Sequence, residues 1–293
     1  MQNHRRNGRI ICSSGPMITV RHGGGTGLKA PLFAYAKPRT LAEALELLAT
    51  HGEGARILAG GQSLIPSLNL RLSAPELLVD ITGIPGLNKV TSNGKSVTIG
   101  ALVTHSRIEK SPDIRKHVPL LAEAAKHIAH AAIRNRGTLG GSLALADPAA
   151  EYPACAVALD GVFTISSLRG ERQVKAADFF KGLFETDLQA GEVLTAAEFP
   201  SGGRSAFHEL TRRHGDYAII GLAAHESRFV FFGAGAIPVF AKNASKEKSL
   251  EKAKEALKRD LDPPADLYNS RATKLHLAGV LLERAWNTLS TSR

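Results

Sequence analysis

Two glycine pairs constrain this chain more than any other sequence feature, because each joins an apolar run to a small hydroxyl residue. The first pair lies in Leu58-Ala59-Gly60-Gly61-Gln62-Ser63, and the second lies in Gly137-Thr138-Leu139-Gly140-Gly141-Ser142. A Gly-Gly bend lets successive backbone N–H groups point into one concavity, and it lets an anion approach the backbone without meeting a Cβ atom. The serine and threonine residues beside the pairs add hydroxyl donors. Together the two segments predict two halves of one phosphate cradle.

The composition is that of a globular protein. At 293 residues, with 43% hydrophobic and 22% charged residues, the chain is long enough for one large domain or for two to three ordinary ones. No apolar stretch approaches the roughly 18 residues of a membrane span, so we expect no transmembrane helix. The two cysteines, Cys12 and Cys155, are too few to hold an iron–sulfur cluster in this chain alone. We expect reduced thiols and a cytoplasmic location.

The net charge of +10 does not by itself indicate a nucleic-acid-binding protein. Half of the excess lies in residues 1–29, which contain five basic residues and no acidic one. Aromatic residues make up only 5% of the chain, so stacking platforms for bases are scarce. The N-terminal segment is polar and glycine-rich and lacks the apolar core of a secretory signal. We expect residues 1–29 to be a disordered extension, and we expect no nucleic-acid partner.

Local patterns predict that helices and strands alternate. Thr40 and Glu43 have the spacing of a capping box, and apolar residues then recur on one helical face up to Gly52. Helical periodicity is also present over residues 119–132, 249–259 and 270–289. Strands are predicted at residues 55–59, 77–81, 87–91, 96–101, 162–166, 172–174, 192–199, 206–210 and 228–232, with hairpin turns at Asn93-Gly94 and Arg169-Gly170.

Common nucleotide-binding and hydrolase motifs are missing. Gly94-Lys95-Ser96 looks like the end of a P-loop, but Lys89 stands where the motif needs its first glycine. The dinucleotide fingerprint GxGxxG is absent too, because Gly233-Ala234-Gly235 runs into Pro238 where a third glycine is needed. No nucleophile elbow, G-x-S-x-G, occurs. If the chain binds a dinucleotide, its architecture is not the Rossmann fold.

The sequence around both glycine pairs is more specific than the pairs themselves. One segment runs Leu58-Ala-Gly-Gly-Gln-Ser-Leu-Ile-Pro-Ser-Leu-Asn-Leu-Arg71, and Ile99-Gly-Ala follows. A further segment runs Ile133-Arg-Asn-Arg-Gly-Thr-Leu-Gly-Gly-Ser-Leu-Ala-Leu-Ala-Asp-Pro-Ala-Ala-Glu-Tyr-Pro153. In this order the segments resemble the FAD-binding medium subunit of molybdenum hydroxylases, the family that includes carbon monoxide dehydrogenases and xanthine dehydrogenases. The resemblance covers roughly residues 30–290.

The resemblance implies an α+β fold. It consists of a two-subdomain FAD-binding domain of the vanillyl-alcohol-oxidase/PCMH type, followed by a small C-terminal domain of antiparallel sheet plus helices. Pro200-Ser201-Gly202-Gly203 is the best linker candidate between these domains. We therefore expect the FAD-binding domain over residues 30–202, with subdomains of about 30–83 and 84–202, and the C-terminal domain over residues 203–293.

The resemblance also implies which residues bind the cofactor. In the family both glycine loops hold the FAD pyrophosphate, and flanking apolar residues lie beside it. The loop positions carried over are Ile57, Leu58, Ala59, Gly60, Gly61, Gln62, Ser63 and Leu64 in the first loop, and Thr138, Leu139, Gly140, Gly141 and Ser142 in the second. Two negative charges need many donors and little side-chain bulk, so the residue types agree with this role.

Further positions along the cofactor follow from the same resemblance. Glu151 corresponds to a carboxylate near the adenosine end, although a solvated loop acid is an equal alternative. Ile128 falls beside the cofactor or in the core. Val193 and Leu194 match residues that line the isoalloxazine ring, and Tyr217 matches a segment close to its face. A strand-core role for the pair and a surface role for the tyrosine stay open.

The sequence departs from the family pattern in three places. Gln62 stands where histidine is frequent, and only histidine titrates near neutral pH. His208, which we include among the cofactor-binding positions, stands where members often carry lysine. A neutral imidazole stabilises an anionic reduced flavin less well than a cation, so a lower potential is expected unless His208 is protonated. The segment between Tyr217 and Phe229 is also short.

We expect no metal site and no catalytic side chain. His127 and His130 have i,i+3 helical spacing, but no Cys or carboxylate partner is evident near them. The leading hypothesis is an FAD-binding electron-transfer subunit, in which the isoalloxazine does the redox chemistry. It would receive electrons from a molybdenum cofactor in a large partner subunit, through iron–sulfur clusters of a small one, and pass them to an external acceptor. A dimer of heterotrimers is expected.

Two alternatives stay open. A self-contained flavin oxidoreductase of the same fold would need an acid–base residue over the flavin, and Tyr217 or His208 are the candidates. A non-catalytic basic protein would instead bind nucleic acid or an acidic partner through residues 1–29.

Overall fold

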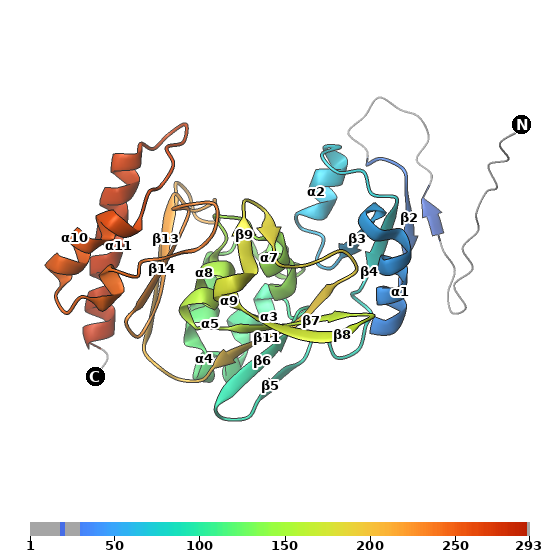
Figure 1. Ribbon diagram of the computed structural model, residues 1–293, viewed down its shortest axis with the longest axis horizontal. Coiled ribbons are helices and arrows are strands. Elements are labelled where there is room, and N and C mark those ends of the chain that lie inside the picture. Colours follow the sequence, from blue (N-terminus) through green and yellow to red (C-terminus); the bar gives the residue numbers. More distant parts are fainter. Residues whose placement is uncertain (1–17, 21–29, 292–293) are drawn as a thin grey trace, which may run out of the picture. The chain divides into compact units, whose positions relative to one another are not determined.

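The computed structural model describes residues 18–20 and 30–291 (Figure 1). Contacts within the chain separate it into two compact units, Met1–Pro85 and Gly86–Arg293. The subdomain boundary expected at residue 83 and the domain boundary expected at residue 202 stay predictions. The expected disordered extension over residues 1–29 lies outside the described residues, except for the strand β1 (Ile18–Val20).

The first unit is built on a mixed sheet of four strands. Its further elements are β2 (Phe33–Ala36), α1 (Leu41–His51), a 3-10 turn (Gly52–Gly54), β3 (Ala55–Leu58), α2 (Leu64–Asn69) and β4 (Leu77–Asp80). The strand order is β1-β2-β4-β3, with β4 parallel to β2 and β3, and β1 antiparallel to β2. Buried leucines of α1 pack against β3 and β4. This packing fixes the end of β3, from which the first glycine segment continues.

The helix predicted from the capping box is confirmed as α1. Thr40 Oγ1 accepts a hydrogen bond from the backbone N–H of Glu43 at 3.2 Å, and Glu43 Oε2 accepts one from the backbone N–H of Arg39 at 2.9 Å. The glutamate thus reaches the residue before the N-cap. The helix ends at His51 because Gly52 has a φ of +51°, a conformation that glycine adopts without a Cβ penalty.

The second unit contains the remaining elements. Its strands are β5 (Val90–Ser92), β6 (Ser96–Gly100), β7 (Val162–Ser167), β8 (Gly170–Lys175), β9 (Phe180–Gly182), β10 (Glu185–Thr186), β11 (Val193–Pro200), β12 (Ser205–Leu210), β13 (Ile220–His225), β14 (Arg228–Phe232) and β15 (Val239–Phe240). Its α-helices are α3 (His105–Lys110), α4 (Pro112–His117), α5 (Pro119–His127), α6 (Ala131–Arg134), α7 (Leu139–Leu145), α8 (Glu151–Ala158), α9 (Ala176–Phe179), α10 (Leu250–Asp260) and α11 (Arg271–Thr291).

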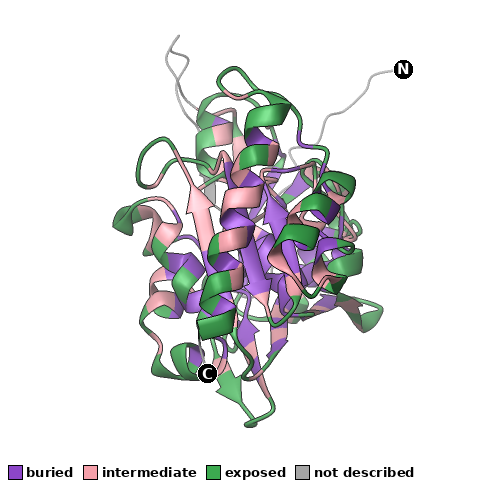
Figure 2. Cartoon of the chain, turned by 90° about the vertical axis from the view of Figure 1, so that its left-hand side faces the viewer, coloured by how far each residue is buried: buried purple, intermediate pink, exposed green. Residues whose placement is uncertain are grey.

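Two antiparallel sheets organise the second unit. The order in the first sheet is β5-β6-β11-β7-β8, and the order in the second is β12-β13-β14-β15. One apolar core joins residues of the first sheet, α3, α5 and α8 to one face of the second sheet. Another core joins the opposite face of the second sheet to α10 and α11. Figure 2 views the latter side, where buried strands lie behind helices with exposed outer faces.

Both predicted hairpins are confirmed. At the first hairpin, Oδ1 of Asn93 accepts hydrogen bonds from the backbone N–H groups of Lys95 and Ser96, at 2.9 and 2.8 Å. Gly94 has a φ of +84°. The Asn-Gly pair favours such tight turns because both residues tolerate a positive φ. At the second hairpin, β7 pairs with β8 as far as Ser167 opposite Gly170.

Several elements differ from the sequence-based expectation, and for three of them the physical reason is clear. The helix expected over residues 119–132 ends at residue 127, because Ile128 is extended and Ala129 has a φ of +39°. The strand β13 was not predicted as a strand of its own, since both of its faces are buried and it shows no polar alternation. The helix α8 was not predicted, since it contains Pro153. This proline lies in the first turn, where a missing N–H breaks no intrahelical hydrogen bond.

The described helices include none that is both long and apolar enough to cross a membrane. Cys155 in α8 is a buried free thiol, and Cys12 lies outside the described residues.

Candidate functional site

The first glycine pair forms an open loop between β3 and α2. Among the described residues, no acceptor receives a hydrogen bond from the backbone N–H groups of residues 59–63. Gly61 has a φ of +74°, and a Cβ atom there would lie 3.1 Å from Ile65 and 3.2 Å from Leu58. Glycine therefore suits both the backbone conformation and the close approach. The loop presents a run of unpaired donors with little side-chain bulk, as an anion site requires.

Carbonyl groups of the same loop are engaged locally. Gln62 Nε2 donates to the Gly60 carbonyl at 3.1 Å. The backbone N–H and the hydroxyl of Ser67 donate to the Ser63 carbonyl at 3.1 and 2.9 Å. These bonds hold the loop against α2 while its N–H groups stay unpaired. Gln62 therefore has a structural role at the position where histidine is frequent in the family.

The second glycine pair does not form the expected bend, because it lies in the first turn of α7. Thr138 is the N-cap residue, and its Oγ1 accepts a hydrogen bond from the Gly141 N–H at 3.1 Å. The other N–H groups of the turn are also paired: Leu139 with the Val103 carbonyl at 3.0 Å, Gly140 with the Ala101 carbonyl at 2.9 Å, and Ser142 with the Thr138 carbonyl at 3.0 Å. These four donors are therefore used within the fold.

Gly140 is required for packing. A Cβ atom on it would lie 2.4 Å from the Cβ of Ala101 and 2.8 Å from its carbonyl oxygen. Gly141 is exposed, and a Cβ there would meet only the Thr138 hydroxyl at 3.0 Å. The hydroxyl of Ser142, which is half-buried, has no hydrogen-bond partner among the described residues. Ser142 and the open surface of Gly141 are thus what this segment offers a ligand.

The apolar residues expected beside the cofactor are half-buried or buried. The first unit provides Ile57, Leu58 and Leu64, and the second provides Ile128, Val193 and Leu194. Ile128 and Leu194 belong to the core of the second unit, which agrees with the alternative of a core contact. Their contact with the cofactor stays a prediction.

Acidic groups gather at the start of α8. Glu151 is its first residue, and burial, followed by the charge of Asp147, raises the pKa of Glu151 to about 7. Tyr217 lies in the segment between β12 and β13, and its side chain is 77% exposed. Partial burial of the hydroxyl raises the pKa of Tyr217, and the charges of Asp147 and Glu151 raise it further. The structure thus brings together Glu151 and Tyr217, two of the predicted positions.

His208 lies on the face of β12 that α11 covers. Along β12, Ala206 belongs to the core with α11, whereas Phe207 belongs to the core with α5 and α8. Side chains alternate between the faces of a strand, so His208 lies on the side of Ala206 and Glu209 on the side of Phe207. Burial, followed by the charge of Arg284 in α11, lowers the pKa of His208. The imidazole is therefore neutral at neutral pH, and its role beside the flavin stays a prediction.

Sequence reasoning missed Glu209. Its side chain is 1% exposed, and neither carboxyl oxygen has a hydrogen-bond partner among the described residues. Burial, followed by the charge of Glu151, raises the pKa of Glu209 to about 8. The signal in the sequence is an acidic residue within a strand, between Phe207 and Leu210.

His127 and His130 do not share a helix. α5 ends at His127, and His130 is the N-cap residue of α6. Within the described residues, no group of three or more His, Cys, Asp or Glu side chains could hold a metal ion. The i,i+3 geometry assumed for these two histidines is therefore wrong.

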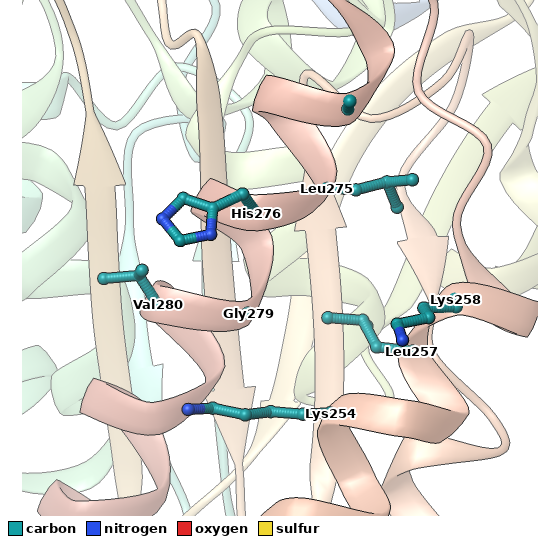
Figure 3. Close-up of a pocket in the computed structure, with 8 residues that line it drawn as sticks. Lys254, Leu257, Lys258, Leu275, His276, Gly279 and Val280 are labelled. Atoms are coloured by element: carbon teal, nitrogen blue, oxygen red, sulfur yellow. The ribbon is translucent and has the colours of Figure 1, made fainter.

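A pocket of about 450 Å³ opens between α10 and α11 (Figure 3). Lys254 and Leu257 reach it from α10, and Leu275 and His276 reach it from α11. None of the predicted cofactor positions lines it. It is lined by the two C-terminal helices, and it is separate in sequence from both glycine segments.

The family described as the FAD binding domain in molybdopterin dehydrogenase matches residues 31–202. The chain belongs to this family. The resemblance read from the two glycine segments is confirmed, and so is the predicted α+β fold class.

Relatives match over nearly their whole length. The 6-hydroxypseudooxynicotine dehydrogenase complex subunit alpha of Paenarthrobacter nicotinovorans is 37% identical over 278 residues, which cover 88% of this chain and 94% of the relative. The carbon monoxide dehydrogenase medium chain of Hydrogenophaga pseudoflava is 34% identical over 277 residues, 88% and 96% of the two chains. A crystal structure of quinoline 2-oxidoreductase from Pseudomonas putida 86 matches with a TM-score of 0.85, 37% identity, and coverage of 89% and 98%.

FAD is accordingly the cofactor of this chain, which is an FAD-binding medium subunit of the molybdenum hydroxylase type and thus part of an oxidoreductase. The residues fit this cofactor. The unpaired N–H groups of residues 59–63 match a pyrophosphate, and the Ser142 hydroxyl adds a donor in the second unit.

Proposed function

We propose that this chain passes electrons from the iron–sulfur clusters of a small partner subunit through its FAD to an external acceptor. The substrate is oxidised at the molybdenum cofactor of a large partner subunit, and the complex is a dimer of heterotrimers in the cytoplasm. When bound, FAD supplies the redox chemistry, while the protein binds and orients it and sets the electrostatics.

The observation that carries this proposal is the loop of residues 59–63. Its backbone N–H groups have no acceptor among the described residues, and these residues are half-buried or exposed, so a ligand can reach them. Such a run of donors is stable only if water or an anionic ligand receives the hydrogen bonds. Backbone donors carry no net charge and do not titrate, so they bind a pyrophosphate over a wide pH range.

The second unit contributes differently. In the first turn of α7 the backbone N–H groups are paired within the protein, so the hydroxyl of Ser142 is the donor left for a phosphate oxygen. Tyr217 is exposed beside Asp147 and Glu151 and offers an aromatic face to the cofactor. Glu151 would accept hydrogen bonds from ribose hydroxyls when it is ionised.

The need for partners follows from the cysteine content. The described part of the chain has a single cysteine, Cys155, which is buried in α8. Iron–sulfur clusters are held mainly by several cysteine thiolates, so clusters that feed this FAD belong to another chain. The name of the Hydrogenophaga relative as a medium chain supports a complex with further subunits of different size.

Substituting Gly61 tests the cradle. Gly61→Ala forces an L-residue to a φ of +74° beside Ile65 and Leu58. We expect at least about tenfold weaker FAD binding, because losing one hydrogen bond to a charged group costs about 1.5–3 kcal/mol. FAD binding by the full chain is measured through quenching of flavin fluorescence.

The matched control is Gly94→Ala. Gly94 has a similar φ of +84°, but it lies in the β5–β6 hairpin, and a Cβ there meets nothing within 4 Å. This variant carries the same kind of backbone strain and should bind FAD as the wild type does. Equal FAD affinities of the two variants would show that the loop is not the pyrophosphate site.

Partner subunits are tested by purifying the chain with the products of its neighbouring genes. A complex that contains FAD, iron and molybdenum supports the proposal. Flavin without iron or molybdenum in any stable complex would favour the self-contained flavin oxidoreductase. Of the two acid–base candidates for that alternative, His208 lies on the side of β12 that α11 covers, whereas Tyr217 is exposed. Nucleic-acid binding that disappears when residues 1–29 are deleted would favour the basic binding protein.

A further inference from the structure

Glu209 is a buried acid without a hydrogen-bond partner. Its side chain is 1% exposed, and both carboxyl oxygens lack a partner among the described residues. A charged carboxylate in such a place is strongly destabilising unless it is paired. The fold nevertheless keeps an acid here, which suggests a role other than packing.

The elements packed against Glu209 offer no permanent cation. From α5, His127 places Nδ1 3.8 Å from Oε2 of Glu209. From α8, Glu151 and Cys155 lie within electrostatic reach. From the sheet, Phe232 covers Gly221, the residue paired with Glu209 on β13. The titratable groups that face Glu209 are thus one imidazole, one acid and one thiol.

The protonation states of these groups follow from burial. Burial, followed by the charge of Glu151, raises the pKa of Glu209 to about 8, and burial lowers the pKa of His127. Burial, then the charges of Glu151 and Glu209, raise the pKa of the Cys155 thiol. At neutral pH Glu209 therefore keeps its proton, the imidazole is neutral and the thiol is not ionised. Glu151, whose pKa is raised to about 7, ionises first, and Glu209 follows at about 8.

Glu209 is linked electrostatically to positions that the family resemblance predicts at the cofactor. Glu151, which acts on Glu209, also acts on Tyr217. With Tyr217 and Glu151 at the cofactor as predicted, a change of charge on the cofactor acts on the linked acids Asp147, Glu151 and Glu209.

We propose that Glu209 is a proton-holding residue that couples the reduction of bound FAD to the uptake of one proton. The proposal rests on the function proposed above. Glu209 acts on the flavin electrostatically, through the charge of its carboxyl group, and does not touch the reacting atoms.

The coupling is balanced in electrons and protons. A reductant, which is the partner's iron–sulfur cluster or dithionite in the experiment, delivers two electrons to the flavin and is itself oxidised. The site becomes more negative, and an ionised Glu209 binds one proton from solvent, which forms an O–H bond on its carboxylate. Reoxidation releases that proton. Well below pH 8 the carboxyl is protonated in both states, so no proton is exchanged there.

The test is a spectroelectrochemical titration of the flavin in the full chain, over a range of about pH 6 to 10 that brackets the ionisation of Glu209. One additional proton per two electrons makes the potential fall more steeply by about 30 mV per pH unit. We expect this steeper segment to begin near pH 8 in the wild type. It should be absent from Glu209→Gln, which keeps the shape and cannot ionise.

Two further variants separate this role from a structural one. Glu209→Asp keeps an ionisable group and should retain the steeper segment. Glu251→Gln makes the same charge change at an exposed position in the first turn of α10 and should behave as the wild type does. If Glu209→Gln titrates with the wild-type slope, or if Glu251→Gln loses the segment as well, the proposal is overturned.

An infrared measurement reads Glu209 without reference to the flavin. The protonated carboxyl gives a C=O band that should disappear above about pH 8 and should be missing in Glu209→Gln. If the wild-type chain binds no FAD, both the proposed function and this proposal are overturned. FAD present with identical slopes, or no such band at neutral pH, overturns this proposal alone.

Discussion

Glu209 should make the stability of the protein depend on pH in a way that Glu209→Gln abolishes. The glutamine has nearly the same shape, and it replaces a carboxyl whose two oxygens have no partner among the described residues. At low pH the buried carboxyl is neutral, so the two proteins should be similarly stable. At high pH the wild type must bury a charge and the variant does not.

The sign and size of the effect follow from linkage. The pKa of Glu209 rises from 4.5 to about 8 on folding, through burial and then Glu151. The unfolded chain therefore releases this proton first, and stability is complete below pH 4.5 and falls as pH rises, until the loss levels off above pH 8. A pKa difference of this size corresponds to on the order of 5 kcal/mol, since each pKa unit is worth 1.36 kcal/mol. The difference in free energy of unfolding between the variant and the wild type should therefore grow by this amount from low to high pH.

The single tryptophan provides the assay. Trp286 in α11 stacks on Phe229 in β14, with ring centroids 6.1 Å apart, so its fluorescence reports on the sheet that contains Glu209. Urea denaturation is compared at about pH 5 and about pH 9, which span most of the change. If the two proteins differ by the same free energy at both pH values, Glu209 does not hold a proton at neutral pH and the reasoning fails.

Two further predictions concern the second glycine segment. Gly140→Ala places a Cβ 2.4 Å from that of Ala101 and should destabilise the protein by about 1–3 kcal/mol. Gly279→Ala in α11, where a Cβ meets nothing within 4 Å, should be neutral or stabilising by about 1 kcal/mol, and equal shifts in thermal unfolding would contradict this contrast. Thr138→Val removes the acceptor of the Gly141 N–H and should cost about 0.5–2 kcal/mol in urea denaturation, whereas Thr138→Ser should retain most of the stability. A serine variant as unstable as the valine variant would exclude the N-cap as the cause.

The sequence was sufficient to predict the structure wherever a short segment determines its own conformation. The capping residues Thr40 and Glu43 define the start of α1, and Asn93-Gly94 defines a hairpin. Family membership and the cofactor were also predictable, because two long segments in a fixed order are specific. Each of these features depends on neighbours in the sequence.

Features that depend on distant residues could not be predicted. Gly140 lacks a side chain because Ala101 approaches it, and no local pattern shows that contact. A glycine that frees an N–H group and a glycine that avoids a clash look the same in sequence. Glu209 escaped notice because its burial depends on α5 and α8, which pack on the face of β12 opposite to α11. The end of α5 at His127 likewise depends on the positive φ of Ala129.

The two glycine pairs therefore have different roles, although their sequences are similar. The first leaves its backbone donors unpaired, and Gln62 within it cannot take up a proton near neutral pH. Retention of FAD by this loop should thus be nearly independent of pH. The second unit pairs its loop donors internally, but it contains acids whose pKa burial raises toward and above neutrality, Glu151 to about 7 and Glu209 to about 8. Binding of the pyrophosphate by the first loop and proton coupling at Glu209 would then depend on different residues, so each can be altered by substitution without the other.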